Sequence, residues 1–187
     1  MKNGHFASAP RIASLSVLVS AALLSACSSM SSMHSQNDLP DAVKVPDGNR
    51  VAMQTVGIGD ITYECRTKKD MAGQFEWTFA GPDAVLNDRG GKQVGKYYGP
   101  PATWEHMDGS KLTGTQLAVA PGGTGNIPFQ LVKANSAVGN GAMTGVTYIQ
   151  RTATKGGVAP NGLCDATTKG SKQTVRYQAD YIFWKAA

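Results

Sequence analysis

Histidine is scarce in this sequence, with three residues among 187, and His106 alone lies within residues 39–187. A zinc site built from two or three histidines of one chain is therefore excluded from that region. A Ser-His-Asp triad would have to use His106, and no Gly-x-Ser-x-Gly elbow accompanies it. Because His106 precedes a turn by two residues, we favour an exposed histidine without a catalytic role.

Residues 39–187 also lack a sustained helical pattern. No stretch of ten or more residues keeps apolar side chains at positions i, i+3, i+4 and i+7. The segment 57–59, Gly-Ile-Gly, lacks the third glycine and the helix of a nicotinamide-binding turn. The Gly-rich segment 139–145 has no following Lys-Ser or Lys-Thr, so it is not a P-loop. We therefore predict no bound cofactor.

A stripe of basic residues is absent as well. The formal charge of +5 falls to +3 once Lys2 and Arg11 are removed with an export signal. The remaining cations are scattered, and the densest group, residues 66–69, adjoins Asp70 and is typical of a solvated turn. This pattern excludes nucleic acid as an expected partner and leaves a weak attraction to anionic surfaces.

The N-terminus has the organisation of a cleavable export signal. A charge-free apolar stretch, residues 12–26, follows Lys2 and Arg11 and is shorter than the roughly 20 residues of a spanning helix. It ends in Leu-Ser-Ala-Cys at residues 24–27, the pattern of a bacterial lipobox. We predict a signal peptide over residues 1–26 and lipidation of Cys27, and the alternative is an ordinary secretory signal with a chance cysteine.

A membrane anchor follows from this interpretation. A lipoprotein cysteine normally carries two or three acyl chains, and several chains anchor a protein stably where one does not. Ser28 stands where an aspartate would favour retention in the inner membrane, so we predict the outer membrane. The Ser-rich residues 27–38 are predicted to be a lipidated tether.

Two cysteines remain once Cys27 is assigned to the lipid. In an oxidising compartment, Cys65 and Cys164 are expected to pair. They are 99 positions apart, and closing a loop of that size stabilises a fold by roughly 4–5 kcal/mol on the chain-entropy model. The alternative is a reactive thiol or a metal ligand, although neither cysteine has a Cys or His neighbour at zinc spacing.

Alternation of apolar and polar residues, as in half-buried strands, dominates the rest of the chain. It is clearest at 61–66, 75–79 and 175–183, and further strands are expected at 51–56, 84–87, 93–98, 103–106, 111–119, 129–133 and 145–152. A tight connection is predicted at 57–60 and an Asp-Gly hairpin turn at 108–110. About ten short strands predict one all-β domain over residues 39–187, an antiparallel β-sandwich or closed barrel with Gly-rich loops.

Several motifs follow one another in a recognisable order: Tyr63-Glu64-Cys65, Ala84-Val85-Leu86-Asn87-Asp88, Pro101-Ala102-Thr103-Trp104-Glu105, Ile149-Gln150-Arg151-Thr152, Gly156-Gly157, Pro160, Cys164 and Tyr177-Gln178-Ala179-Asp180-Tyr181. In this order the chain resembles the DUF3455 family, a domain of unknown function in exported bacterial and secreted fungal proteins. The resemblance covers roughly residues 39–185 and implies a β-rich fold and paired cysteines. Some fungal members are labelled malate dehydrogenase, an activity that the missing nicotinamide motif does not support.

Two groups of residues are candidates for a ligand site. Trp104 and Glu105 beside Asp108 would suit a carbohydrate, as an aromatic platform next to acidic groups, and paired carboxylates can hydrolyse glycosides. The alternative, which we favour, is that Trp104 packs in the core while the acids face water. Arg151 would suit an anion, although an arginine on an antiparallel strand more often pairs with a carboxylate. The predicted ligand site comprises Trp104, Glu105, His106, Asp108 and Arg151.

The sequence thus predicts an exported lipoprotein with one β domain that binds a ligand or has a structural role in the cell envelope, and that is not an enzyme. The alternative is a hydrolase acting on an envelope carbohydrate. Expected partners are the membrane, through the lipid anchor, and a polysaccharide or other envelope component.

Overall fold

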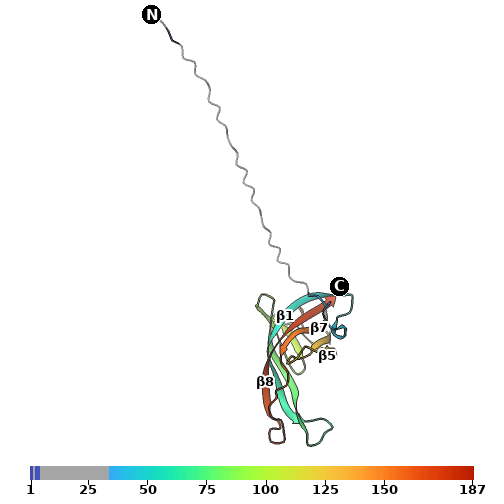
Figure 1. Cartoon of the computed structure of the whole chain (residues 1–187). Coiled ribbons are helices and arrows are strands. Elements are labelled where there is room, and N and C mark those ends of the chain that lie inside the picture. The colour runs from blue at the N-terminus through green and yellow to red at the C-terminus, as the bar shows by residue number, and fades with distance from the viewer. Residues whose placement is uncertain (2, 5–33) are drawn as a thin grey trace. The chain divides into compact units, whose positions relative to one another are not determined.

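The structure is a computed structural model that describes residues 1, 3, 4 and 34–187 (Figure 1). Cys27 and nearly all of the predicted export signal lie outside the described residues. Among the residues described, no helix has the length and apolar character needed to cross a membrane. Residues 34–187 form one unit, and the description below concerns that unit.

Eight antiparallel strands form a single sheet, preceded in the described chain by one 3₁₀ turn, η1 (Asp41–Val43). The strands are β1 (Asn49–Thr67), β2 (Phe75–Asn87), β3 (Gln93–Tyr98), β4 (Thr103–His106), β5 (Lys111–Ala120), β6 (Phe129–Ala134), β7 (Val146–Gly156) and β8 (Lys172–Ala186). Each strand pairs with the next, and β1 also pairs with β8, so the sheet closes into a barrel. The predicted all-β antiparallel fold is confirmed, and the sheet closes on itself instead of forming two packed layers.

The predicted count of about ten strands is wrong, because two long strands each contain residues that resemble a turn. β1 runs for 19 residues straight through the predicted connection at 57–60. β2 runs for 13 residues through Pro82. β3 pairs with β2 only from Asp83 onward, so Pro82 has β1 alone beside it. Proline has no backbone N–H, and it is tolerated at such a local edge because the side of the strand without a neighbour needs no N–H donor.

Gly57 and Gly59 of β1 allow two close approaches, by the Tyr181 ring at Gly57 and by the backbone of β2 at Gly59. A Cβ atom on Gly57 would lie 2.5 Å from Cε2 of Tyr181. A Cβ atom on Gly59 would overlap the carbonyl oxygen of Asp83 on β2. Neither glycine has a positive φ, so close packing, and not turn conformation, requires glycine at both positions.

Stacked aromatic rings fill the middle of the barrel. Tyr97 stacks on Trp104 with ring centroids 4.7 Å apart, and its centroid lies 5.1 Å from that of Tyr181. The hydroxyls of Tyr177 and Tyr181 hydrogen-bond to each other at 3.1 Å. Pairs of this kind contribute about 0.5–1.5 kcal/mol each beyond the apolar area that they bury. The lumen at this level is therefore filled by side chains.

A second apolar cluster covers part of the outer face of the barrel, around β6 and β8. Ile182 and Trp184 alternate along β8 with inward-facing residues, so they point outward. Val43 and Val45, which precede β1, pack against them together with Leu131. The N-terminal segment (residues 34–45) is thus fixed to the barrel by apolar burial.

Hydrogen bonds of Gln150 hold the same N-terminal segment. The buried Gln150 side chain donates to the Val43 carbonyl at 2.6 Å and to Gln36 Oε1 at 3.0 Å. Its own Oε1 lies 2.8 Å from Nε2 of His34. The predicted tether of residues 27–38 therefore overlaps a segment whose residues from His34 onward contact the barrel.

Three strands continue past one end of the barrel as a barrel extension, made of residues 60–67 of β1, 75–82 of β2 and 172–176 of β8 (Figure 1). Here β3 no longer lies beside β2, and β7 no longer lies beside β8. Instead, the connection between β7 and β8 packs on the extension, where the Tyr63 hydroxyl donates to the Gly157 carbonyl at 2.8 Å and the Trp77 indole N–H donates to the Gly162 carbonyl at 2.8 Å.

A disulfide between Cys65 and Cys164 secures the extension, as predicted. The two Cα atoms are 5.5 Å apart, and Cys65 is fully buried on β1. Cys164 lies between β7 and β8, so the bond ties this connection to the extension. The backbone N–H of Cys65 also donates to the Ser171 carbonyl at 2.9 Å, which reinforces the link.

Candidate functional site

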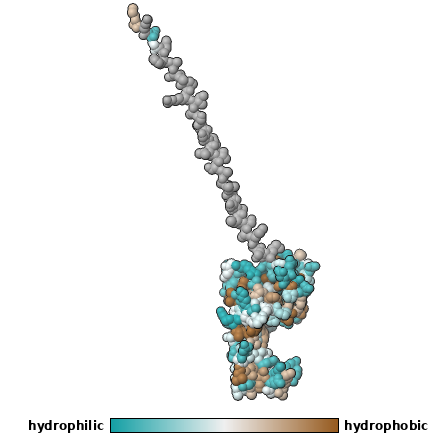
Figure 2. Space-filling view, in the orientation of Figure 1, coloured by the Kyte–Doolittle hydropathy of each residue, from teal (hydrophilic) through white to brown (hydrophobic). Residues whose placement is uncertain are grey.

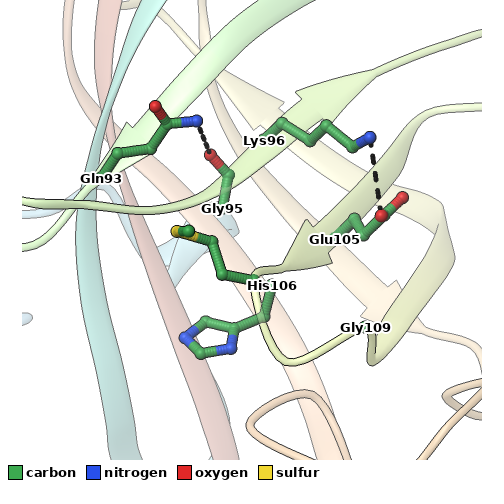
Figure 3. Close-up of a pocket in the computed structure, with 7 residues that line it drawn as sticks. Gln93, Gly95, Lys96, Glu105, His106 and Gly109 are labelled. Carbon is green, nitrogen blue, oxygen red and sulfur yellow. Dashed lines mark hydrogen bonds and ion pairs between the residues drawn. The ribbon is translucent and has the colours of Figure 1, made fainter.

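Two predicted site residues, Glu105 and His106, line a cavity of about 220 Å³ beside β3 and β4. Lys96 of β3 forms another part of its wall, with Nζ 3.5 Å from Oε1 of Glu105. Figure 3 shows Lys96 and Glu105 turned toward each other while the His106 ring points away from both. The cavity thus has an ion pair on one side and an imidazole on the other.

Asp108 is fixed in the turn between β4 and β5, which is the hairpin that the sequence predicts. Its Oδ1 accepts hydrogen bonds from the Ser110 hydroxyl at 2.6 Å and the Ser110 N–H at 2.9 Å. Its Oδ2 accepts from the Ala142 N–H at 2.7 Å and lies 3.0 Å from Nδ1 of His106. These bonds, the Ser110 hydroxyl first, hold the pKa of Asp108 far below its usual value. His106 and Asp108 therefore meet within a network that ties the turn to the loop at residue 142.

Trp104 and Glu105 point to opposite faces of β4. Trp104 is 1% exposed and stacked on Tyr97, so its ring is not a surface platform for a sugar. Glu105 accepts a 2.6 Å hydrogen bond from the Tyr98 hydroxyl, which, more than the charge of Lys96, lowers its pKa. Lowered pKa values keep Glu105 and Asp108 ionised, whereas cleavage of a glycoside needs a carboxyl group with a raised pKa as proton donor.

A second cavity, of about 270 Å³, lies where the barrel meets the extension, and we call it the junction cavity. Tyr63 and Phe79 line it from the extension, Tyr97 from β3 and Arg151 from β7. Phe79 is 50% exposed, although it lies directly opposite the buried Tyr63 and on the same face of the sheet. Figure 2 shows apolar surface at this narrow junction.

Arg151 points into the barrel. It pairs with Tyr181 on β8 and with Gln130 on β6, and residues directly opposite each other on antiparallel strands share a face. Its Nε and Nη2 donate to the Pro128 carbonyl at 3.1 and 3.0 Å. Within residues 34–187 it forms no ion pair, so the expected carboxylate partner is missing there.

Buried phenols surround this guanidinium. Burial raises the pKa of Tyr63, Tyr97, Tyr177 and Tyr181, while the charge of Arg151 acts on all four in the opposite direction. The phenols therefore stay protonated at neutral pH, and Tyr63 donates its hydroxyl proton to the Gly157 carbonyl at 2.8 Å. The buried indole N–H of Trp104, stacked on Tyr97, has no acceptor among the described residues.

The structure does not bring the five predicted site residues together: Trp104 packs in the core and Asp108 is held in the turn after β4. Glu105 and His106 line the β3–β4 cavity, whereas Arg151 lines the junction cavity. Sequence reasoning missed Tyr63, Phe79 and Tyr97 as its companions, although alternation marks each as belonging to one face of a strand. In the described part of the chain, no three side chains of His, Cys, Asp and Glu are grouped as a metal site would require.

These features define a closed antiparallel β-barrel domain with an aromatic cavity and an inward-facing cation at one end. The chain belongs to the DUF3455 family, described as a protein of unknown function, whose family model matches residues 46–185. The resemblance drawn from the motifs is thereby confirmed. No curated protein and no solved structure matches the chain.

Proposed function

We propose that this chain is an exported lipoprotein, anchored through Cys27, whose barrel binds a small ligand in the junction cavity and does not transform it. The observation that carries the binding function is the cavity itself, which combines apolar walls with a few polar groups as ligand sites do. Mouths of β-barrels are a frequent place for such sites.

The exposure of Phe79 supports this proposal. An aromatic side chain that faces inward and is still half exposed retains apolar area that a ligand can bury. Burial of apolar surface is favourable by roughly 25 cal/mol per Å². A ligand that covers Phe79 and contacts Tyr63 and Tyr97 therefore gains binding free energy without displacing protein contacts.

The binding proposal is tested with N-phenyl-1-naphthylamine, an uncharged dye that fluoresces in apolar surroundings. We expect saturable binding to the purified protein and its loss in Ala102→Phe, because Ala102 lines the cavity and a phenyl ring there would fill it. Ala72→Phe, at an exposed position between β1 and β2, is the matched control and should bind like the unaltered protein. Equal binding by both variants would refute the cavity as the site.

The anchor is tested separately by metabolic labelling with palmitate. We expect label on the unaltered chain, recovery in outer-membrane fractions, and loss of both in Cys27→Ser. Label retained by Cys27→Ser would contradict the anchor.

The alternative function, that of a hydrolase, predicts a different result. Release of reducing sugar from an envelope polysaccharide, abolished by Glu105→Gln, would support the β3–β4 cavity as an active site. We expect no such release, because the pKa of Glu105 is lowered and its partners, Tyr98 and Lys96, hold it ionised.

A further inference from the structure

We infer that the ligand of the junction cavity is a small anion with a flat apolar body, of the aromatic carboxylate or sulfonate class, whose charged group binds Arg151. The inference rests on the proposed binding function and adds the chemistry of the ligand to it. Of the side chains that line the cavity, Arg151 carries the charge, and the others are aromatic, aliphatic or amide groups.

The first argument is electrostatic. Arg151 lines the cavity, is partly exposed, and has no carboxylate partner among residues 34–187, so its guanidinium is available to an anion that enters the cavity. The two bonds to Pro128 use two of the five N–H groups of Arg151, so up to three remain for a ligand. An anion would neutralise the positive charge of the Arg151 guanidinium. Arginine binds planar carboxylates through paired, charge-assisted hydrogen bonds.

The second argument concerns the body of the ligand. Tyr63 and Phe79 meet edge to face, with ring centroids 6.3 Å apart and planes at 84°. Tyr97 adds a third ring to the wall of the cavity. Aromatic walls favour a flat ring, which stacks on a ring face or meets a ring edge. A ring that bears an acidic group therefore matches both the wall and the charge.

The third argument concerns the size of the ligand. The cavity has a volume of about 270 Å³. Beyond Tyr97 the lumen is blocked by Trp104 and Tyr181, which stack against it. A long acyl chain would need this space, so a compact ring fits where a fatty acid does not.

Two dyes with one skeleton test the inference. 8-Anilino-1-naphthalenesulfonate and N-phenyl-1-naphthylamine differ by the sulfonate, so comparing their affinities isolates the charge. In Arg151→Gln we expect the sulfonate dye to bind about tenfold or more weakly, and the neutral dye to change less than about twofold. The matched control is Arg176→Gln on the extension, where an exposed arginine pairs with Asp60; it should leave both affinities unchanged.

The outcomes separate the inference from the binding proposal. If Arg151→Gln leaves the sulfonate dye unaffected, or weakens both dyes equally while its circular dichroism is native, the inference is overturned and the cavity remains a neutral site. If neither dye binds the unaltered protein, both the inference and the binding proposal fail. Should Arg151→Gln not fold, Arg151→Met is measured in its place against Arg151→Lys, and the sulfonate dye must prefer the lysine variant by about tenfold.

Discussion

Replacing Gly59 by alanine should destabilise the barrel strongly, although it adds a single methyl group. The new Cβ would overlap the carbonyl oxygen of Asp83 and lie 2.5 Å from the Cα of Ala84, both backbone atoms of the neighbouring strand. Backbone atoms cannot move aside as a flexible side chain can, so β1 and β2 would have to separate locally. Overpacking typically costs about 1–3 kcal/mol and more where the backbone must shift, so we expect about 3 kcal/mol or more.

Thermal unfolding followed by circular dichroism measures this effect. At about 2–4 °C per kcal/mol for a domain of this size, Gly59→Ala should lower the Tm by about 6–12 °C. Gly90→Ala is the matched control, since Gly90 lies in the turn after β2 without a positive φ and a Cβ there meets only the Asp88 side chain, 3.2 Å away. A difference of less than about 1 kcal/mol between the two variants would refute close packing as the reason for glycine.

Three further perturbations have defined outcomes. Replacing Cys65 and Cys164 together by alanine should lower the free energy of unfolding by about 4–5 kcal/mol, measured by urea denaturation; a loss below about 1 kcal/mol would contradict the loop-closure estimate. Burial lowers the pKa of His34 below 6.5, so the stability of the packed N-terminal segment is present above that pH and is lost as pH falls through the lowered pKa. Proteolysis near this segment should therefore accelerate below about pH 6 in the unaltered protein but not in His34→Gln, and equal acceleration in both would exclude His34 as the cause. Asp108→Asn should lower the Tm at neutral pH, and the difference should shrink progressively below about pH 4, because a lowered carboxyl pKa stabilises the fold fully above its unfolded value of 3.8 and this stabilisation is lost as pH falls toward the folded-state pKa. A difference that does not depend on pH would show that the charge of Asp108 is irrelevant.

The strand pattern was predictable because alternation reports directly which residues face a core. The hairpin at 108–110 was predictable too, since Asp-Gly stabilises a tight turn locally. The glycines at 57 and 59 were misleading because local sequence does not reveal the ring of Tyr181 or the backbone of β2 beside them. A glycine that permits close packing and a glycine that permits a turn are identical in sequence.

The candidate site was harder to predict for a related reason. Arg151 was identified as an anion-binding candidate, yet its companions come from strands far apart in the sequence. Phe79 and Tyr63 line one cavity with Arg151 only because the sheet closes on itself and brings β1 and β2 near β7. Adjacent residues such as Glu105 and Trp104 look like one site in sequence, but alternation sends them to opposite faces of β4.

Closure of the barrel by its first and last strands has a consequence for the order of folding. Asn49 of β1 pairs with Ala186 of β8, a separation of 137 positions, so the seam joins the first and the last strand of the barrel. A chain that emerges N-terminus first can form the β1–β2 hairpin early, but it cannot close the ring until its final 15-residue strand has arrived. Pairing over such separations is slow, because loop-closure entropy must be overcome first. Until then the barrel stays open at the seam between β1 and β8.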